Sequence, residues 1–231
     1  MSSVPGFTAL ARWRLSRRLN HEAEHCAVPW LAAYLASLTD LLSLPVPQMP
    51  LLAFDLEMTG LEPSVDEILS IGAVPIDGPR LTLTGAWHCL VAGDTGVGQS
   101  ACIHGIVDQD LQQGTKLERA LVELFARAKG RWLVAHHAPL DISFLTHAIE
   151  HLYGVNVSLP AIDTMALEHR RLQMTQQPQV EGGLRLAACR QRYGLPLYPA
   201  HNALMDAIGC GELLLAQKSA IQPASVIELL Q

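Results

Sequence analysis

The stretch that decides the fold runs from Leu51 to Gly60 and reads Leu-Leu-Ala-Phe-Asp-Leu-Glu-Met-Thr-Gly. Up to Glu57 it is short, apolar and bounded by turn residues, which is typical of a buried strand. Asp55 and Glu57 are two residues apart, so on a strand both side chains project from the same face. An acid pair at the end of an apolar strand is costly on a packed face. The pair is reasonable if it faces a metal ion at the edge of the strand.

Two later segments each place an aspartate on the apolar side of a predicted helix. Both acids share a face with apolar residues near the helix start: Asp141 with Leu145, Ala148 and Leu152, and Asp206 with Cys210 and Leu213. The helix dipole accounts for one inward acid of this kind. Two of them, together with the strand pair, predict a pocket of four carboxylates that would repel one another without cations among them. The sequence therefore predicts a divalent-metal site, and metal sites of this kind cut phosphodiesters.

His201 precedes Asp206 by five residues, so the two side chains would diverge if both lay on one helix. The better interpretation puts His201 in the loop before the helix, with Asn202 as the N-cap. From there the imidazole would lie over a metal site held by Asp206. An unperturbed histidine has a pKa near ~6.5 and is suited to take a proton from a water molecule.

Strand patterns come first after residue 49 and then alternate with helix patterns, which predicts an α/β fold with a mixed sheet flanked by helices. The predicted strands are 51–57, 68–76, 81–91, 132–135 and 161–163, with Asp77-Gly78 as a hairpin signal after the second. The predicted helices are 117–128, 139–152, one that opens at Thr164, 184–193 and 203–217. The predicted domain division is a helical extension with a proline-rich linker over 1–48, the main domain over 49–220 and a tail over 221–231.

Composition narrows the class of protein. Apolar residues make up 49% and charged residues 16% of the 231 residues, so a well-filled core is expected. A net charge of −6 argues against a protein that coats nucleic acid by bulk electrostatics. The five cysteines form no C-x-x-C pair, which suggests reduced thiols and a cytoplasmic protein. No signal peptide is evident, and Pro29 and Asp40 interrupt the most membrane-like stretch, so no membrane association is expected.

The N-terminal region has a basic stretch with Arg12, Arg14, Arg17 and Arg18, followed by a helical pattern. Contact with a nucleic-acid backbone and a solvated helix face are both open interpretations of these arginines.

Three segments in order, Phe-Asp-Leu-Glu-Met-Thr-Gly, His-x-x-x-Asp-x-x-Phe and His-x-x-x-x-Asp, resemble the exonuclease motifs of the DnaQ-like DEDDh family. That family includes the proofreading epsilon subunit of bacterial DNA polymerase III. The resemblance extends from about Leu51 to Gln217, and Ile103-His104-Gly105-Ile106 and Asp163-Thr164 are similar to secondary signatures. It implies a ribonuclease H-like fold and removal of nucleoside monophosphates from a 3′ end.

The resemblance also implies roles for individual residues. The implied ligands of two Mg²⁺ or Mn²⁺ ions are Asp55, Glu57, Asp141 and Asp206. The implied general base is His201. The implied contacts to the terminal nucleotide are Met58, Thr59, Gly60, Leu61, His104 and Phe144. For Phe144, packing against a base or sugar and a place in the helix core remain alternatives.

The match has departures, and the function has alternatives. His137 stands where the second motif commonly has Asn, and offers an extra nitrogen near the metals or altered nucleotide contacts. The first motif also resembles that of oligoribonuclease.

The leading prediction is a metal-dependent 3′–5′ exonuclease on single-stranded DNA, of the proofreading or repair type. The alternatives are a 3′–5′ exoribonuclease and a non-catalytic nuclease-fold subunit, and residues 1–48 are a predicted contact for a polymerase or another protein.

Overall fold

A mixed β-sheet with β1 at its centre organises the chain. The computed structural model describes residues 5–93, 111–178 and 180–230. Its strands are β1 Leu51–Met58, β2 Ile68–Asp77, β3 Arg80–Leu81, β4 Trp87–Leu90, β5 Trp132–Ala135 and β6 Ala161–Asp163. Their order is β3-β2-β1-β5-β6, with β4 also paired to β2. β1 is antiparallel to β2 and parallel to β5, and β5 is parallel to β6, so the predicted mixed sheet is confirmed.

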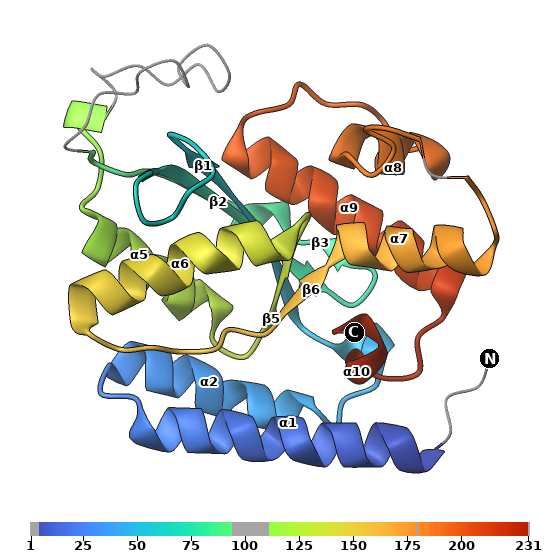
Figure 1. Ribbon diagram of the computed structural model, residues 1–231, viewed down its shortest axis with the longest axis horizontal. Helices are drawn as coiled ribbons and strands as arrows, with labels where there is room; N and C mark the ends of the chain where they lie inside the picture. The colour runs from blue at the N-terminus through green and yellow to red at the C-terminus, as the bar shows by residue number, and fades with distance from the viewer. Residues whose placement is uncertain (1–4, 94–110, 179, 231) are drawn as a thin grey trace.

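Helices flank this sheet (Figure 1). The longer ones are α1 Pro5–His25, α2 Pro29–Leu41, α5 Leu117–Ala128, α6 Ala138–Tyr153, α7 Thr164–Met174 and α9 Ala203–Ile221. The short ones are α8 Leu186–Arg192, α10 Val226–Leu229 and the 3-10 turns η1 Val46–Gln48 and η2 Leu83–Gly85. α9 packs along β1 and β2, while α6 contacts β5 and β6. The sheet and its helices have the predicted ribonuclease H-like arrangement.

Local sequence signals mark where the helices over the sheet begin. Pro139 lies in the first turn of α6, where its missing N–H costs nothing. The side chain of Asn202 caps α9 by accepting a hydrogen bond from the Met205 N–H at 3.1 Å. Asp163 caps α7 in the same way. Pro139 and the Asn202 cap thus begin α6 and α9 just before Asp141 and Asp206.

One predicted strand is wrong. The pattern over 81–91 predicted a single strand, whereas the structure has β3 and β4 separated by η2. The cause lies in β2, where Pro75 has no N–H to give to an edge strand. The Pro75 carbonyl accepts a hydrogen bond from the Thr82 N–H, after which the chain leaves the edge and rejoins β2 at Trp87.

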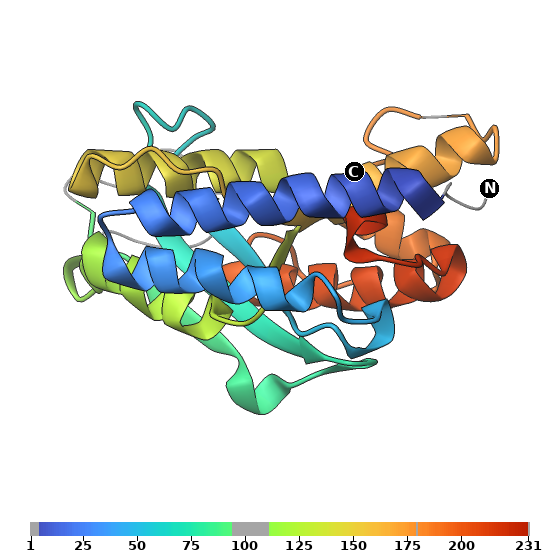
Figure 2. The same ribbon diagram turned by 90° about the horizontal axis from the view of Figure 1, so that it is seen from below.

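The N-terminal helices form an antiparallel hairpin along one side of the molecule (Figures 1 and 2). α2 is built into the core: Leu31, Tyr34, Leu35 and Leu38 are fully buried. Tyr34 lies edge-on to Phe125 of α5, with ring centroids 5.1 Å apart. α10 packs against α1, so the last described helix lies beside the first. The domain boundaries at 48 and 220 stay predictions.

In the described part of the chain, no helix combines the length and apolar character needed to cross a membrane. The most membrane-like stretch of the sequence contains α2, which packs against α1 and α5.

Candidate metal centre

The acid pair of β1 lies on the face of the sheet that α9 covers. Residues alternate in direction along a strand, so Ala53, Asp55 and Glu57 share one face. α9 packs on this face, because a Cβ placed on Gly211 would lie 3.3 Å from the Ala53 Cβ. Asp55 is half-buried and Glu57 is 8% exposed. The predicted orientation of the pair is therefore confirmed.

Asp206 reaches the pair because α9 begins directly over β2. Gly72 pairs with Asp55 in the β1–β2 ladder, and a Cβ on Gly72 would lie 2.2 Å from the backbone of Ala203. Only glycine leaves room for this approach. Ligand oxygens of Asp55, Glu57 and Asp206 consequently lie within 4.8 Å of one another, close enough to hold one cation among them.

We expect Gly72→Ala to lower the free energy of unfolding by about 1–3 kcal/mol or more, because the added methyl overlaps backbone atoms that cannot move alone. Thermal and urea unfolding measure the loss. Gly211→Ala is the control and should cost less, since its Cβ would lie 3.3 Å from side-chain atoms of Ala53, Ile76 and Leu81 and would overlap no backbone atom. Wild-type stability in Gly72→Ala would contradict the close approach of α9 to β2.

Asp141 joins the site from the first turn of α6. Its side chain is 4% exposed, and its Oδ1 accepts a hydrogen bond from the Leu56 N–H at 3.2 Å. Leu56 lies between Asp55 and Glu57, so this bond attaches α6 to the acid pair. On the predicted apolar face, Leu145 and Ala148 are buried, whereas Leu152 near the helix end is 39% exposed.

Burial raises the pKa of all four acids, and the charges of neighbouring acids raise it further for Asp55, Glu57 and Asp141. The pKa of Asp55 lies well above its usual range because of burial and then the charges of Asp141, Asp206 and Glu57. Burial and the charge of Asp206 raise the pKa of Glu57 to about 7. Burial raises the pKa of Asp141 and of Asp206, and for Asp206 the His201 N–H and the Arg190 charge partly offset it.

This chemistry fits divalent cations. The donors are all carboxylate oxygens, which are the ligands that Mg²⁺ and Mn²⁺ prefer. A cation among them would replace repulsion by attraction and return the pKa values toward the normal range. The residues present therefore fit the predicted metals.

The metal-free protein is expected to lose stability as the pH rises from about 5 to about 8. Unfolded carboxyls titrate near ~4, whereas the folded Glu57 titrates at about 7. Between these values the folded state holds more protons, so its stability falls as the pH rises. Melting temperatures in EDTA should fall over this range, and Mn²⁺ should raise them more at pH 8 than at pH 5. A melting temperature in EDTA that does not change with pH would contradict the buried acid cluster.

His201 lies in the loop before α9, as predicted. Its backbone φ is 68°, its side chain is exposed, and its N–H donates to Asp206 Oδ2 at 2.8 Å. The backbone thus fixes His201 next to an acid of the cluster, while the imidazole has no hydrogen-bond partner within the described residues.

The residues predicted to contact substrate differ in their position in the fold and in how exposed they are. Met58 ends β1, and Thr59, Gly60 and Leu61 form the turn after it, with Leu61 74% exposed. Phe144 is 2% exposed and belongs to the hydrophobic core. His104 lies outside the described residues. The roles of all six in substrate binding stay predictions.

The sequence did not indicate what holds the turn after β1. The Thr59 hydroxyl donates to Asp66 Oδ1 at 3.0 Å, and the Glu62 N–H donates to Asp66 Oδ2 at 2.9 Å. A Cβ on Gly60 would overlap the Asp66 carboxylate. The signal that would have found Asp66 is an aspartate between a glycine turn and the next strand, a common site for side chain to backbone hydrogen bonds.

His137 occupies a special backbone position at the start of α6. Its φ is 72°, and its N–H donates to Asp163 Oδ1 at 2.9 Å. The same oxygen accepts from the Met165 N–H at 2.9 Å. Asp163 therefore joins the start of α6 to the start of α7, and the left-handed conformation suits the Asn that the second motif commonly has here.

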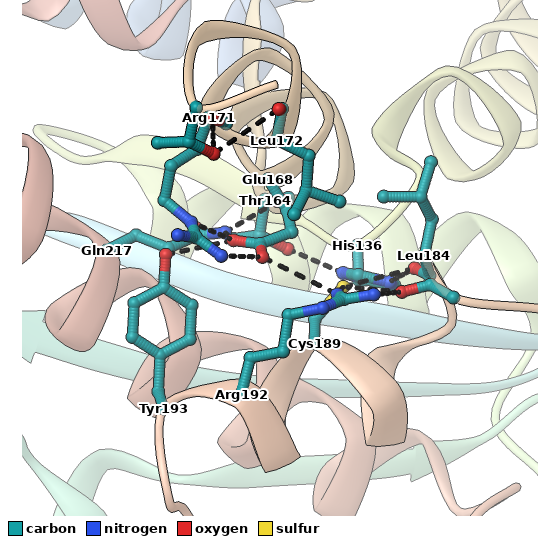
Figure 3. Close-up of polar contacts among 12 residues, drawn as sticks. His136, Thr164, Glu168, Arg171, Leu172, Leu184, Cys189, Arg192, Tyr193 and Gln217 are labelled. Atoms are coloured by element: carbon teal, nitrogen blue, oxygen red, sulfur yellow. Dashed lines mark hydrogen bonds and ion pairs between the residues drawn. The ribbon is translucent and has the colours of Figure 1, made fainter. Parts of the chain in front are cut away.

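A buried carboxylate joins α7, α8 and α9 (Figure 3). Glu168 of α7 is fully buried and accepts from Arg171 at 2.7 Å and from the Tyr193 hydroxyl at 2.9 Å. Arg192 of α8 and Gln217 of α9 each lie 3.5 Å away. Burial raises the pKa of Glu168, but these hydrogen bonds outweigh it and the pKa is lowered. Only the pair of Glu168 with Arg171 is local in the sequence, and the other members of this network come together only in the fold.

The sequence matches the RNase_T family model, described as an exonuclease, over residues 52–214. The PolC-type DNA polymerase III of Thermotoga maritima is 32% identical over 154 residues, which are 66% of this chain and 11% of that protein. An epsilon-like protein of DNA polymerase III from Rhodobacter capsulatus is 30% identical over 77% of this chain and 25% of its own length. The DNA polymerase III subunit epsilon of Treponema pallidum is 30% identical over 70% of this chain and 73% of its own length. The chain thus spans only a small part of the first two proteins.

Solved structures share the fold. Exonuclease I superposes with a TM-score of 0.65 and 13% identity over 74% of this chain and 41% of its own. The nuclease domain of 3′hExo, a DEDDh family member bound to rAMP, has a TM-score of 0.61 and 14% identity over 74% of this chain and 92% of its own. At such identities these likenesses concern the fold alone.

Proposed function

The chain belongs to the RNase_T exonuclease family, and on that premise we propose that it is a divalent-metal-dependent 3′–5′ exonuclease acting on single-stranded DNA. The observation that supports this most is the cluster of Asp55, Glu57 and Asp206 oxygens within 4.8 Å, with Asp141 bonded to the backbone between the strand acids. The pattern of the three motifs and the polymerase III relatives point to the same reaction class.

In this proposal the four acids Asp55, Glu57, Asp141 and Asp206 hold two Mg²⁺ or Mn²⁺ ions. The bound ions supply Lewis acidity and neutralise the charge that develops on the phosphate. The protein contributes rigidity: Asp55 and Glu57 are fixed on the central strand, Asp206 lies in the capped first turn of α9, and Asp141 lies in the first turn of α6, which Pro139 begins. Carboxylates held in this way need no rearrangement during the reaction.

His201 is the proposed general base. Its imidazole is exposed at the edge of the acid cluster and can accept the proton of the attacking water. Its backbone hydrogen bond to Asp206 sets the distance between the base and the acids. The proton then leaves to solvent, which the exposed ring contacts directly.

The proposed substrate is a single-stranded 3′ end. The turn of Thr59, Gly60 and Leu61 follows the acid pair and is fixed by hydrogen bonds to Asp66, so the terminal nucleotide would lie against a defined surface. DNA is favoured because the relatives are DNA polymerase III proteins. Discrimination against RNA depends on the space around the terminal 2′ position.

The experiment that tests this substrate uses DNA and RNA oligonucleotides of one sequence, labelled at the 5′ end, with Mg²⁺, Mn²⁺ or EDTA. Metal-dependent shortening that is faster for DNA is the expected result. Equal or faster shortening of RNA would favour the exoribonuclease alternative. A folded, metal-binding protein that cleaves neither would favour a non-catalytic binding subunit.

A protein partner, such as a polymerase, is proposed to contact α1. Among its described side chains, Arg12, Arg14 and Arg18 are exposed, and Trp13 is 54% exposed beneath Arg17. Because α2 is part of the core, deletion of residues 1–48 would damage the fold. Trp13→Ala combined with Arg14→Glu is the better test and should leave hydrolysis of a short oligonucleotide unchanged.

A further inference from the structure

The loop between α8 and α9 ends at His201 and has no buried side chains of its own to hold it in place. It is largely exposed, with Leu195 and Tyr198 only half-buried. At its far end the chain is fixed by the His201 N–H on Asp206 and by the Asn202 cap. A mobile loop would spread the imidazole over many positions, so something must hold the part that precedes it.

Arg190, in the last turn of α8, makes those contacts. It is 2% exposed. Its Nη2 donates to the Pro196 carbonyl at 2.6 Å and its Nε donates to the same oxygen at 3.2 Å. Its guanidinium carbon lies 4.5 Å from the centre of the Tyr198 ring. The arginine thus holds the loop at two points, one polar and one aromatic.

The same guanidinium is fixed to α9. Its Nη1 donates to the Gly209 carbonyl at 2.6 Å, and its Nη2 pairs with Glu212 at 2.8 Å. The Tyr198 hydroxyl donates to the other oxygen of Glu212 at 3.1 Å. Gly209 and Glu212 follow Asp206 on one helix, so Arg190 joins the loop that ends at His201 to the helix that presents Asp206.

α8 does not depend on Arg190 for its own attachment. Arg192 donates to the Gly183 carbonyl, and Tyr193 binds the buried Glu168 (Figure 3). Loss of the Arg190 side chain would therefore release the loop while α8 stays bound to α7.

We propose that Arg190 is a positioning residue that holds His201 beside Asp206 through the Pro196 carbonyl and the Tyr198 ring. The inference rests on the proposed function of His201 as the base. Arginine suits this role because its planar fork reaches two carbonyls and a carboxylate at once, which a lysine cannot do.

The test compares Arg190→Met and Arg190→Lys with the wild type on a single-stranded DNA oligonucleotide. We expect kcat to fall roughly 10- to 100-fold in Arg190→Met, the range found for residues that orient catalytic groups. KM and Mn²⁺ affinity should change little, and Arg190→Lys should recover only part of kcat. Arg192→Met on the same helix is the control, with a lower melting temperature but an unchanged kcat.

A double-mutant cycle separates positioning from general damage. In the His201→Ala background, Arg190→Met should cost little further activity, because the group it positions is gone. Folded Arg190 variants with wild-type kcat, or effects that multiply in the double variant, would overturn the inference. If Arg190→Met does not fold, Tyr198→Leu gives the same comparison and should lower kcat without raising KM. Full activity in His201→Ala would overturn the proposed base and this inference together, whereas an inactive His201→Ala beside an active Arg190→Met overturns this inference alone.

Discussion

Asp55→Asn is expected to abolish exonuclease activity and to weaken Mn²⁺ binding strongly. Asp55 is the acid whose pKa is raised by burial and by the charges of the other three acids. Bound cations would therefore relieve more repulsion at Asp55 than at the other acids. The amide keeps the shape of the side chain and removes the charge. Loss of several kcal/mol of transition-state stabilisation corresponds to a rate loss of roughly 10³-fold or more.

The amide variant should also be more stable than the wild type in EDTA, because one repelling charge is gone. Asp40→Asn is the control for charge, since Asp40 is exposed at the end of α2. Calorimetric titration with Mn²⁺ and single-turnover cleavage provide the two measurements. A fully active Asp55→Asn protein would refute the metal site.

His201→Ala is expected to lower kcat by roughly 10²- to 10⁴-fold, the usual contribution of a general base. Mn²⁺ affinity should be preserved, because the contact with Asp206 comes from the backbone N–H, which alanine also has. This separation of turnover from metal binding distinguishes a base from a ligand.

His147→Ala provides the matched control, since His147 is an exposed histidine on α6. The positive φ of His201 adds one complication, because alanine is more strained than glycine in this backbone conformation. His201→Gly therefore tests whether any loss arises from the backbone. Turnover at the wild-type level in both variants would remove the base assignment.

The sequence predicted those parts of the fold whose signals are local. Alternation placed Asp55 and Glu57 on one face of a strand, helical spacing turned Asp141 and Asp206 inward, and the cap residue Asn202 fixed where α9 begins. Each of these signals lies within a few residues of the group it positions, so one sequence is enough to detect it.

Contacts between distant segments could not be predicted in this way. Gly72 in β2 makes room for α9, and Arg190 and Glu168 bind partners from other helices. Apart from Arg171, which is three residues from Glu168 on the same helix, nothing near these residues in the sequence marks their partners, because the contacts exist only once the helices and strands are packed. The break between β3 and β4 had a local cause, Pro75, but its effect appears on the neighbouring strand.

The most direct measurement compares a linear 5′-labelled single-stranded DNA with a covalently closed circle of the same sequence, each with Mg²⁺ or with EDTA. The four-acid site and the family predict that the linear strand shortens in single-nucleotide steps from its free 3′ end, only with metal, while the circle stays intact. Cleavage of the circle, or shortening that persists in EDTA, would contradict a metal-dependent 3′–5′ exonuclease.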